Sequence, residues 1–246
     1  MTLPQGKVVI ELAPKIAPKH VAQFKRLAKQ GFYNGNKFYR VIDGFVAQAG
    51  PSVDNDILAP ELIMESEWHP DQHWTWQKVE NHDMFAPATG FYQSFAIGYD
   101  QGHNLAWLTH CPGVIAMARN NEPNSGSSHF YFTIGQAPRY LDRIMTIFGR
   151  VVYGMDKVQA ITRTAVMEGQ PAVAKQDYTP IINMQIMADV PLAQQLNIEV
   201  EDTDSAEFVK AMQDRRARKN AFFYKKPPPV LDVCQIPIKS RLLPSH

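Results

Sequence analysis

The stretch KFYRVIDGFVAQAG, Lys37 to Gly50, carries the pattern that decides the fold. An Asp-Gly pair in its middle is typical of a tight turn, and the residues on both sides read as strands, so the stretch predicts a β-hairpin. Alternation along a strand places Phe38 and Arg40 on one side and Tyr39 on the other. Arg40 and Gln48 thus lie among bulky apolar residues, which raises the question of what these polar side chains do.

The bulk properties exclude several classes of protein. The chain has 246 residues, enough for one large domain or two small ones. Its 25 basic and 24 acidic side chains nearly balance, so nucleic acid is not an expected partner. No stretch is apolar and long enough to predict a membrane span, and the N-terminal MTLPQGKVVIEL lacks the apolar core of a signal peptide.

The first elements have clear local signals. Residues 7–12, KVVIEL, are rich in β-branched side chains and predict a strand. A helix should follow, since Pro18 suits a first helical turn and Phe24 belongs to a set of apolar residues at helical spacing. Gly31 is placed to end this helix.

From about residue 51 to residue 108 the periodic pattern is lost, although tryptophans argue against disorder. We therefore expect a long ordered insert with little regular structure. Several histidines lie in or just after it, namely His69, His73, His82, His103 and His110. Pro70 interrupts any helical spacing of the first two, and no carboxylate or cysteine set has ligand spacing, so no metal is expected.

Regular structure returns after the insert. Strands are expected at residues 113–118, 129–135, 146–152 and 180–188, with a short helix at 154–161. Short strands around two helices favour a mainly antiparallel barrel or sandwich.

The C-terminal tail contains a third predicted helix. Asp204 is placed as its N-cap, with Glu207 three residues later, and Phe208, Ala211 and Met212 form an apolar face. The proline run after Lys226 ends this pattern.

Three ordered stretches together resemble the cyclophilins, the peptidyl-prolyl cis/trans isomerases: FYRVIDGFVAQAG, MARNNEPNSGSSHFYF and YLDRIMTIFGRVVYGM. The resemblance covers about residues 6–50 and 113–188. It implies an eight-stranded antiparallel β-barrel capped by two helices, here residues 1–188 with the insert at about 51–108. Residues 189–246 would be a helical C-terminal extension packed on the barrel, and the family's first strand is missing or reduced to MTL.

The reaction of this family needs no nucleophile, metal or cofactor. Rotating an X–Pro bond must break amide resonance against a barrier of about 18–20 kcal/mol. The prolyl nitrogen then gains a lone pair, to which a fixed guanidinium can donate. From the residues alone, a surface arginine beside a solvated glutamine is the simpler interpretation. The resemblance instead implies that Arg40 is the catalytic donor and that Gln48 orients it or binds the substrate backbone.

The resemblance also implies a peptide-binding set. An apolar socket for proline would be formed by Phe45, Met117, Tyr131 and Leu141, although each could equally be an ordinary core residue. Ala118 and Arg119 would offer backbone to an extended peptide. Four positions differ from common family residues: Val46, His129, Tyr140 and Met145. A structural partner for His129 is as plausible as a substrate contact.

These features predict a monomeric isomerase that acts on proline-containing peptides and unfolded protein clients. The alternatives are a module that binds proline peptides with little turnover, or a scaffold whose insert and tail contact a partner. Cyclosporin-type inhibitors should bind weakly, because Tyr140 lacks the indole N–H of the tryptophan common at this position.

The chain has two cysteines, Cys111 at the end of the insert and Cys234 in the tail. They could be unrelated buried thiols. The resemblance to a bacterial subgroup, often secreted, favours a Cys111–Cys234 disulfide in an oxidising compartment. The expected location is therefore periplasmic or otherwise exported, with a signal peptide upstream of this sequence, or cytoplasmic if both thiols are free.

Overall fold

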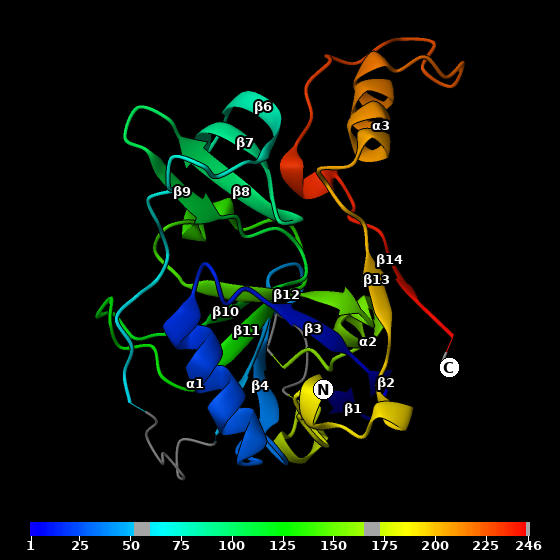
Figure 1. Cartoon of the computed structure of the whole chain (residues 1–246). Helices are drawn as coiled ribbons and strands as arrows, with labels where there is room; N and C mark the ends of the chain where they lie inside the picture. Colours follow the sequence, from blue (N-terminus) through cyan, green and yellow to red (C-terminus); the bar gives the residue numbers. More distant parts are fainter. Residues whose placement is uncertain (52–59, 165–172, 245–246) are drawn as a thin grey trace. The chain divides into compact units, whose positions relative to one another are not determined.

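A computed structural model describes residues 1–51, 60–164 and 173–244 (Figure 1). The chain forms two compact units, which are described separately. The first unit comprises residues 1–66, 110–199 and 241–246, and the second comprises residues 67–109 and 200–240. The boundaries expected from the sequence, 1–188 and 189–246, follow chain order, whereas these units combine segments distant in sequence. The start of the expected insert, residues 52–59, lies outside the described residues.

The strands of the first unit are mostly short. They are β1 (Thr2–Leu3), β2 (Gly6–Lys7), β3 (Val9–Leu12), β4 (Lys37–Val41), β5 (Val46–Gly50), β10 (Val114–Met117), β11 (Phe130–Thr133) and β12 (Ile147–Tyr153). Its helices are α1 (Pro18–Lys29) and α2 (Met155–Gln159), with 3₁₀ turns η2 (Arg139–Leu141), η3 (Lys175–Asp177), η4 (Met187–Asp189) and η5 (Leu192–Gln194).

Six of these strands form one antiparallel sheet in the order β3-β12-β10-β11-β5-β4. Further backbone contacts continue it beyond β4. Lys37 bridges Pro180, Asn183 bridges Thr2 of β1, and β1 pairs with β2, which leads through Val8 back into β3. With β2 and β3 counted as one interrupted strand, eight segments are linked in a ring, and the fold is mainly β, as the sequence predicts.

The ring contains two departures from the expected strands. The first strand is present but reduced to β1, as expected for MTL. Residues 180–188 do not form a regular strand; they make isolated bridges at Pro180 and Asn183 and then enter η4. Pro180 has no backbone N–H to donate to a ladder, which accounts for the interruption at its position.

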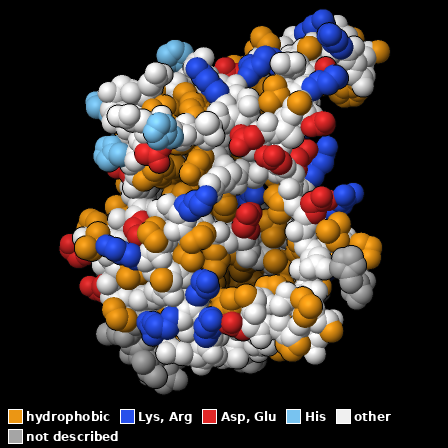
Figure 2. All heavy atoms as spheres, in the orientation of Figure 1, with side chains coloured by type: hydrophobic (Ala, Val, Ile, Leu, Met, Phe, Trp, Pro, Cys, Tyr) orange, Lys and Arg blue, Asp and Glu red, His pale blue; other side chains and the backbone are white. Residues whose placement is uncertain are grey.

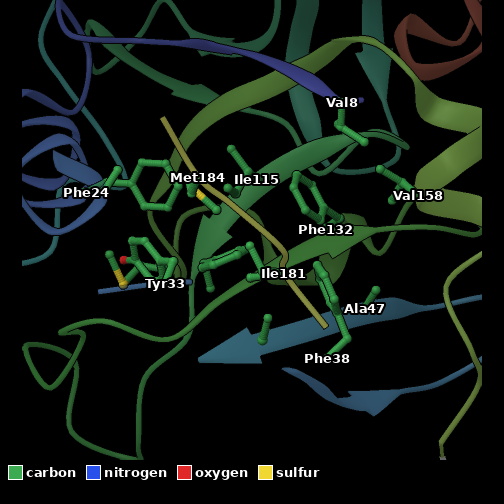
Figure 3. Close-up of a cluster of buried hydrophobic side chains, with 14 of the residues drawn as sticks. Val8, Phe24, Tyr33, Phe38, Ala47, Ile115, Phe132, Val158, Ile181 and Met184 are labelled. Carbon is green, nitrogen blue, oxygen red and sulfur yellow. The ribbon is translucent and has the colours of Figure 1, made fainter. Parts of the chain in front are cut away.

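Helix α1 begins at Pro18 and ends as its sequence predicts. Gln30 is the C-cap and Gly31 follows at φ +70°, the left-handed conformation that glycine tolerates best. Its apolar face, including Phe24, packs into a core that also holds Phe132 from the sheet and Val158 from α2 (Figure 3). This core fixes the backbone that carries the hairpin of β4 and β5.

The hairpin forms as predicted, but its faces differ from simple alternation. Phe38 and Val41 both lie in the core, while Arg40 is exposed. The register shifts between Phe38 and Arg40 because a bulge inserts one residue into β4. The expectation that Phe38 and Arg40 share a face was therefore wrong, and the bulge turns Arg40 outward.

The second unit contains regular structure that the sequence did not predict. Its strands β6 (Gln77–Asp83), β7 (Ala86–Tyr92), β8 (Phe95–Asp100) and β9 (Leu105–Leu108) form an antiparallel sheet in chain order. The insert is thus a sheet rather than an irregular excursion. Helix α3 (Ala206–Ala217) and the turn η6 (Val233–Gln235) also belong to this unit. Strands β13 (Ile198–Val200) and β14 (Ser240–Leu242) form a separate two-stranded sheet.

Helix α3 packs on this sheet through one aromatic residue. Phe208 is buried and its ring contacts Phe91 of β7 edge to face, with centroids 5.4 Å apart. The N-cap is Ser205, whose Oγ accepts from Phe208 N at 3.2 Å, so the predicted Asp204 cap was one residue too early. The expected apolar face is also reduced, since only Phe208 is buried.

Figure 2 shows histidine side chains at the surface of the second unit, where His69, His73 and His103 are exposed. Within the described residues, no group of three or more His, Cys, Asp or Glu side chains could hold a metal ion. No helix in the same part of the chain has the length and apolarity needed to cross a bilayer.

The chain's two cysteines are both disulfide-bonded, so Cys111 is joined to Cys234. This confirms the predicted disulfide and excludes the pair of unrelated thiols.

Candidate functional site

Arg40 and Gln48 occupy opposite positions on β4 and β5. Arg40 is exposed, and its Nη1 donates to Gln48 Oε1 at 3.3 Å. The guanidinium carbon also lies 5.9 Å from the ring centroid of Phe45, within range of a cation–π contact. The guanidinium thus has two neighbours, Gln48 and Phe45, while the residue as a whole is exposed.

The orientation of Gln48 depends on a residue that the sequence analysis missed. Gln48 Nε2 donates to Tyr39 Oη at 2.5 Å, and Tyr39 Oη lies 2.8 Å from His129 Nδ1. Simple alternation predicts that Tyr39 and Arg40 lie on different faces of the sheet. The bulge in β4 instead lets Gln48 form hydrogen bonds with both side chains. His129 therefore has a structural partner, and its ring lies against Gly50, where an added Cβ would come within 2.4 Å of Nδ1.

Strand pairing adds a third strand, β11, to this arrangement. Gln48 is opposite Tyr131 on β11, and directly opposed residues project on the same face. We call the face of these strands that carries Arg40, Gln48 and Tyr131 the site face. The other face of these strands holds Ala47 and Phe130 in the core.

Aromatic rings border Arg40. Phe45 stacks with Tyr140 at a centroid distance of 6.4 Å and an interplanar angle of 20°, and Tyr140 is 63% exposed. Tyr140 and Leu141 belong to η2, and Leu141 and Met145 are half-buried. Apolar surface therefore lies beside the guanidinium.

Tyr131 is almost fully buried, at 4% exposure. Its hydroxyl lies 2.9 Å from His110 Nε2, and the two rings stack with an interplanar angle of 15°. Burial, and then the nearby Asp142 carboxylate, raise the pKa of Tyr131 far above its usual range. The hydroxyl therefore keeps its proton at neutral pH.

The four other predicted site residues lie in different environments. Val46 is buried, and Met117 belongs to the core cluster. Ala118 N donates to His129 O at 2.9 Å, which continues the β10–β11 ladder. Arg119 donates to three loop carbonyls, those of Ile144, Asn120 and Asn121, at 2.8–3.2 Å.

Two cavities among the described residues of the first unit have neither Arg40 nor Gln48 in their lining. One of about 340 Å³ lies between the N-terminal strands, α1 and residues 183–196, and none of the predicted site residues lines it. Another, of about 10 Å³, is lined by Met117 and Arg119 together with His20.

The chain is similar to several known proteins. A family model described as cyclophilin type peptidyl-prolyl cis-trans isomerase/CLD matches residues 1–187. A probable peptidyl-prolyl cis-trans isomerase of Brucella suis is 33% identical over 193 residues, which cover 77% of this chain and 82% of that protein. Peptidyl-prolyl cis-trans isomerase B of Bacillus subtilis is 26% identical over 163 residues, 66% of this chain and 88% of that protein. The crystal structure of a cyclophilin from Hirschia baltica aligns with a TM-score of 0.79 and 29% identity, covering 99% of this chain and 90% of that one.

Proposed function

Because the chain belongs to the cyclophilin-type peptidyl-prolyl cis-trans isomerase family, we propose that Arg40 catalyses rotation of X–Pro bonds in protein clients. The observation that carries this proposal is the exposed guanidinium of Arg40, held by Gln48 at 3.3 Å beside the ring of Phe45. It is a fixed donor next to apolar surface, which is the combination that the reaction needs.

The chemistry follows from the loss of amide resonance. As the X–Pro bond twists, the prolyl nitrogen becomes pyramidal and its lone pair becomes available to a donor. Arg40 donates to this nitrogen, and the interaction is stronger in the twisted state than in either planar isomer, so it lowers the barrier. No bond is formed or broken, and uncatalysed exchange takes roughly tens to hundreds of seconds.

The surrounding residues hold the arginine and the proline. Gln48, itself fixed by Tyr39, limits the directions that the guanidinium can take. The prolyl ring would contact Phe45, Leu141 and Tyr131, with Tyr140 and Met145 at the border. Val46 and Met117 would support this surface from beneath, and the backbone near Ala118 and Arg119 would align the peptide.

A second candidate function is binding of proline-containing segments with little turnover. It is favoured by one observation: the His129 ring is engaged by Tyr39 at 2.8 Å, so it is less available to position a substrate backbone. This module would share the apolar contacts but would gain little from Arg40.

The disulfide bears on location. Such bonds persist in oxidising compartments, so we place the protein in the periplasm or outside the cell. Its clients there would be unfolded or newly exported proteins with exposed X–Pro bonds, and we expect it to act as a monomer.

The deciding experiment is an isomerisation assay on a tetrapeptide with a central Ala-Pro bond, with exchange followed by NMR line shapes. The isomerase accelerates exchange at catalytic concentrations of protein. Peptide that binds the protein without faster exchange would reject the enzyme and favour the binding module.

A further inference from the structure

A chain of buried polar residues lies directly behind the site face. His110, Arg139 and Asp142 are all at most 8% exposed, and they connect to Tyr131. None of them is used by the mechanism above. Burying so many polar groups is costly unless each is paired, so the arrangement calls for an explanation.

The donors around Asp142 determine the direction of each hydrogen bond. Its Oδ1 accepts from His110 N at 2.8 Å and lies 3.0 Å from His110 Nδ1, while Oδ2 accepts from Arg139 Nε at 2.5 Å. A carboxylate with these neighbours is an acceptor, so Nδ1 of His110 carries a proton. In a neutral imidazole Nε2 is then the acceptor, so we assign the Tyr131 hydroxyl as the donor across this 2.9 Å contact.

This chain of contacts joins two parts of the site that lie on different elements. Tyr131 lies on β11, whereas Tyr140 and Leu141 lie on η2, whose first residue is Arg139 and whose C-cap is Asp142. His110 contacts Tyr131 with one ring nitrogen and Asp142 with the other. It therefore fixes the Tyr131 ring relative to the turn that carries Leu141.

We propose that His110 is a positioning residue for the proline socket, holding Tyr131 on β11 and the turn η2 in one fixed arrangement through Asp142. This proposal rests on the proposed function, because it assumes that Tyr131 and Leu141 contact the prolyl ring. His110 itself touches no substrate. Its loss loosens the socket, which weakens proline binding more than it slows the twist.

Two substitutions of His110 separate its contacts. In His110→Asn the amide nitrogen takes the place of Nδ1 and can still reach Asp142, but nothing reaches Tyr131. In His110→Gln the amide takes the place of Nε2 and keeps a partner for the Tyr131 hydroxyl. We expect KM for the Ala-Pro tetrapeptide to rise about fivefold in His110→Asn, with kcat within about twofold, and to be partly restored in His110→Gln.

Tyr131→Phe removes the same contact from the other side at nearly constant volume. It should raise KM by a similar factor, and adding His110→Asn should change KM little further, since both remove one interaction. His20→Asn is the matched control, because His20 is also buried and pairs with a carboxylate, Glu65, in the same unit. Its KM should equal that of the wild type.

Unchanged KM in folded His110→Asn, or KM increases that multiply in the double variant, would overturn the proposal. If His110→Asn does not fold, Tyr131→Phe decides alone, and wild-type KM in that variant overturns it. If the wild type binds the tetrapeptide without isomerising it, the same variants are compared by Kd in place of KM. The positioning role of His110 is then still tested, although the proposed isomerase activity is rejected. A wild type that neither binds nor isomerises the tetrapeptide overturns both.

Discussion

Arg40 and Gln48 are direct partners across β4 and β5, and Arg40 Nη1 donates to Gln48 Oε1 at 3.3 Å. The contact is possible because the bulge after Phe38 turns Arg40 away from the core. A guanidinium held this way has already given up part of its side-chain freedom before substrate arrives, which is what preorganised donation requires.

Arg40→Ala should lower kcat/KM for the Ala-Pro tetrapeptide by about 100-fold or more, since it removes the donor to the prolyl nitrogen. Tm should change by less than about 3 °C, because the exposed side chain supports little packing. Arg163→Ala is the matched control: Arg163 also contacts the hairpin, through Asp43 at 2.9 Å, but lies outside the proposed machinery. A folded, fully active Arg40→Ala protein would show that the mechanism is wrong.

Tyr39→Phe should lower kcat/KM by about fivefold. The substitution removes the acceptor that holds Gln48 Nε2 at 2.5 Å, so Gln48 can rotate and Arg40 is held less firmly. Tyr99→Phe, which removes a hydroxyl bonded to Asn104 in the second unit, should leave the assay unchanged. Equal kcat/KM in wild type and Tyr39→Phe would mean that Gln48 does not need Tyr39.

Tyr140→Trp should tighten binding of a cyclosporin-type inhibitor, because the indole adds an N–H donor. Tyr140 is largely exposed, so the larger ring has room and peptide turnover should change little. Titration of both proteins with the drug measures the effect, with Tyr153→Trp on β12 as the control for an added exposed indole. Equal affinities would mean that Tyr140 is not at the inhibitor site.

The hairpin and α1 could be predicted from sequence because their signals are local. A turn pair, alternating apolar residues and a glycine after a helix each act within a few residues of themselves. Simple alternation of residues does not reveal the bulge in β4, which is why Arg40 was wrongly expected to share the face of Phe38. The cap of α3 shows the same limit, since Asp204 and Ser205 are both good N-caps and only the backbone decides between them.

Contacts over long sequence distances could not be predicted in this way. His110 looked like one of several insert histidines, and its partners Tyr131 and Asp142 lie 21 and 32 residues away. The sheet of the second unit could not be predicted from the sequence for a related reason. Strands such as QKVENHD are polar and non-alternating, and the sheet packs on Phe208, which contacts Phe91 more than 100 positions earlier in the chain.

Reduction of the Cys111–Cys234 disulfide should destabilise the protein. The bond closes a loop longer than about 100 residues, for which the chain-entropy model gives about 4–5 kcal/mol, although real values are often smaller. Urea midpoints should fall in reductant, and each transition is followed separately because a chain with two units need not unfold in one step. The Cys111→Ser/Cys234→Ser variant should be insensitive to reductant. Two free thiols in unreduced, oxidised protein would refute the bond.

Stability should also fall as the pH drops below about 6.5, through His20 at the start of α1. Burial lowers the pKa of His20 from 6.5 and outweighs the opposing effects of the Glu65 carboxylate, which lies 2.8 Å from Nδ1; nearby Lys19 lowers this pKa further. The unfolded chain therefore binds a proton at a higher pH than the folded chain does.

It follows that protonation favours unfolding as the pH falls through 6.5 toward the lower folded pKa, whereas above 6.5 the contribution of His20 is fully present. Glu65 also caps α1, because its carboxylate accepts from the backbone N–H groups of Lys19 and His20. Urea unfolding at pH 8, 6.5 and 5 compares the wild type with His20→Gln, which cannot titrate at this position. The loss of stability between pH 6.5 and pH 5 should be smaller in His20→Gln. Identical pH profiles would show that His20 does not couple protonation to folding.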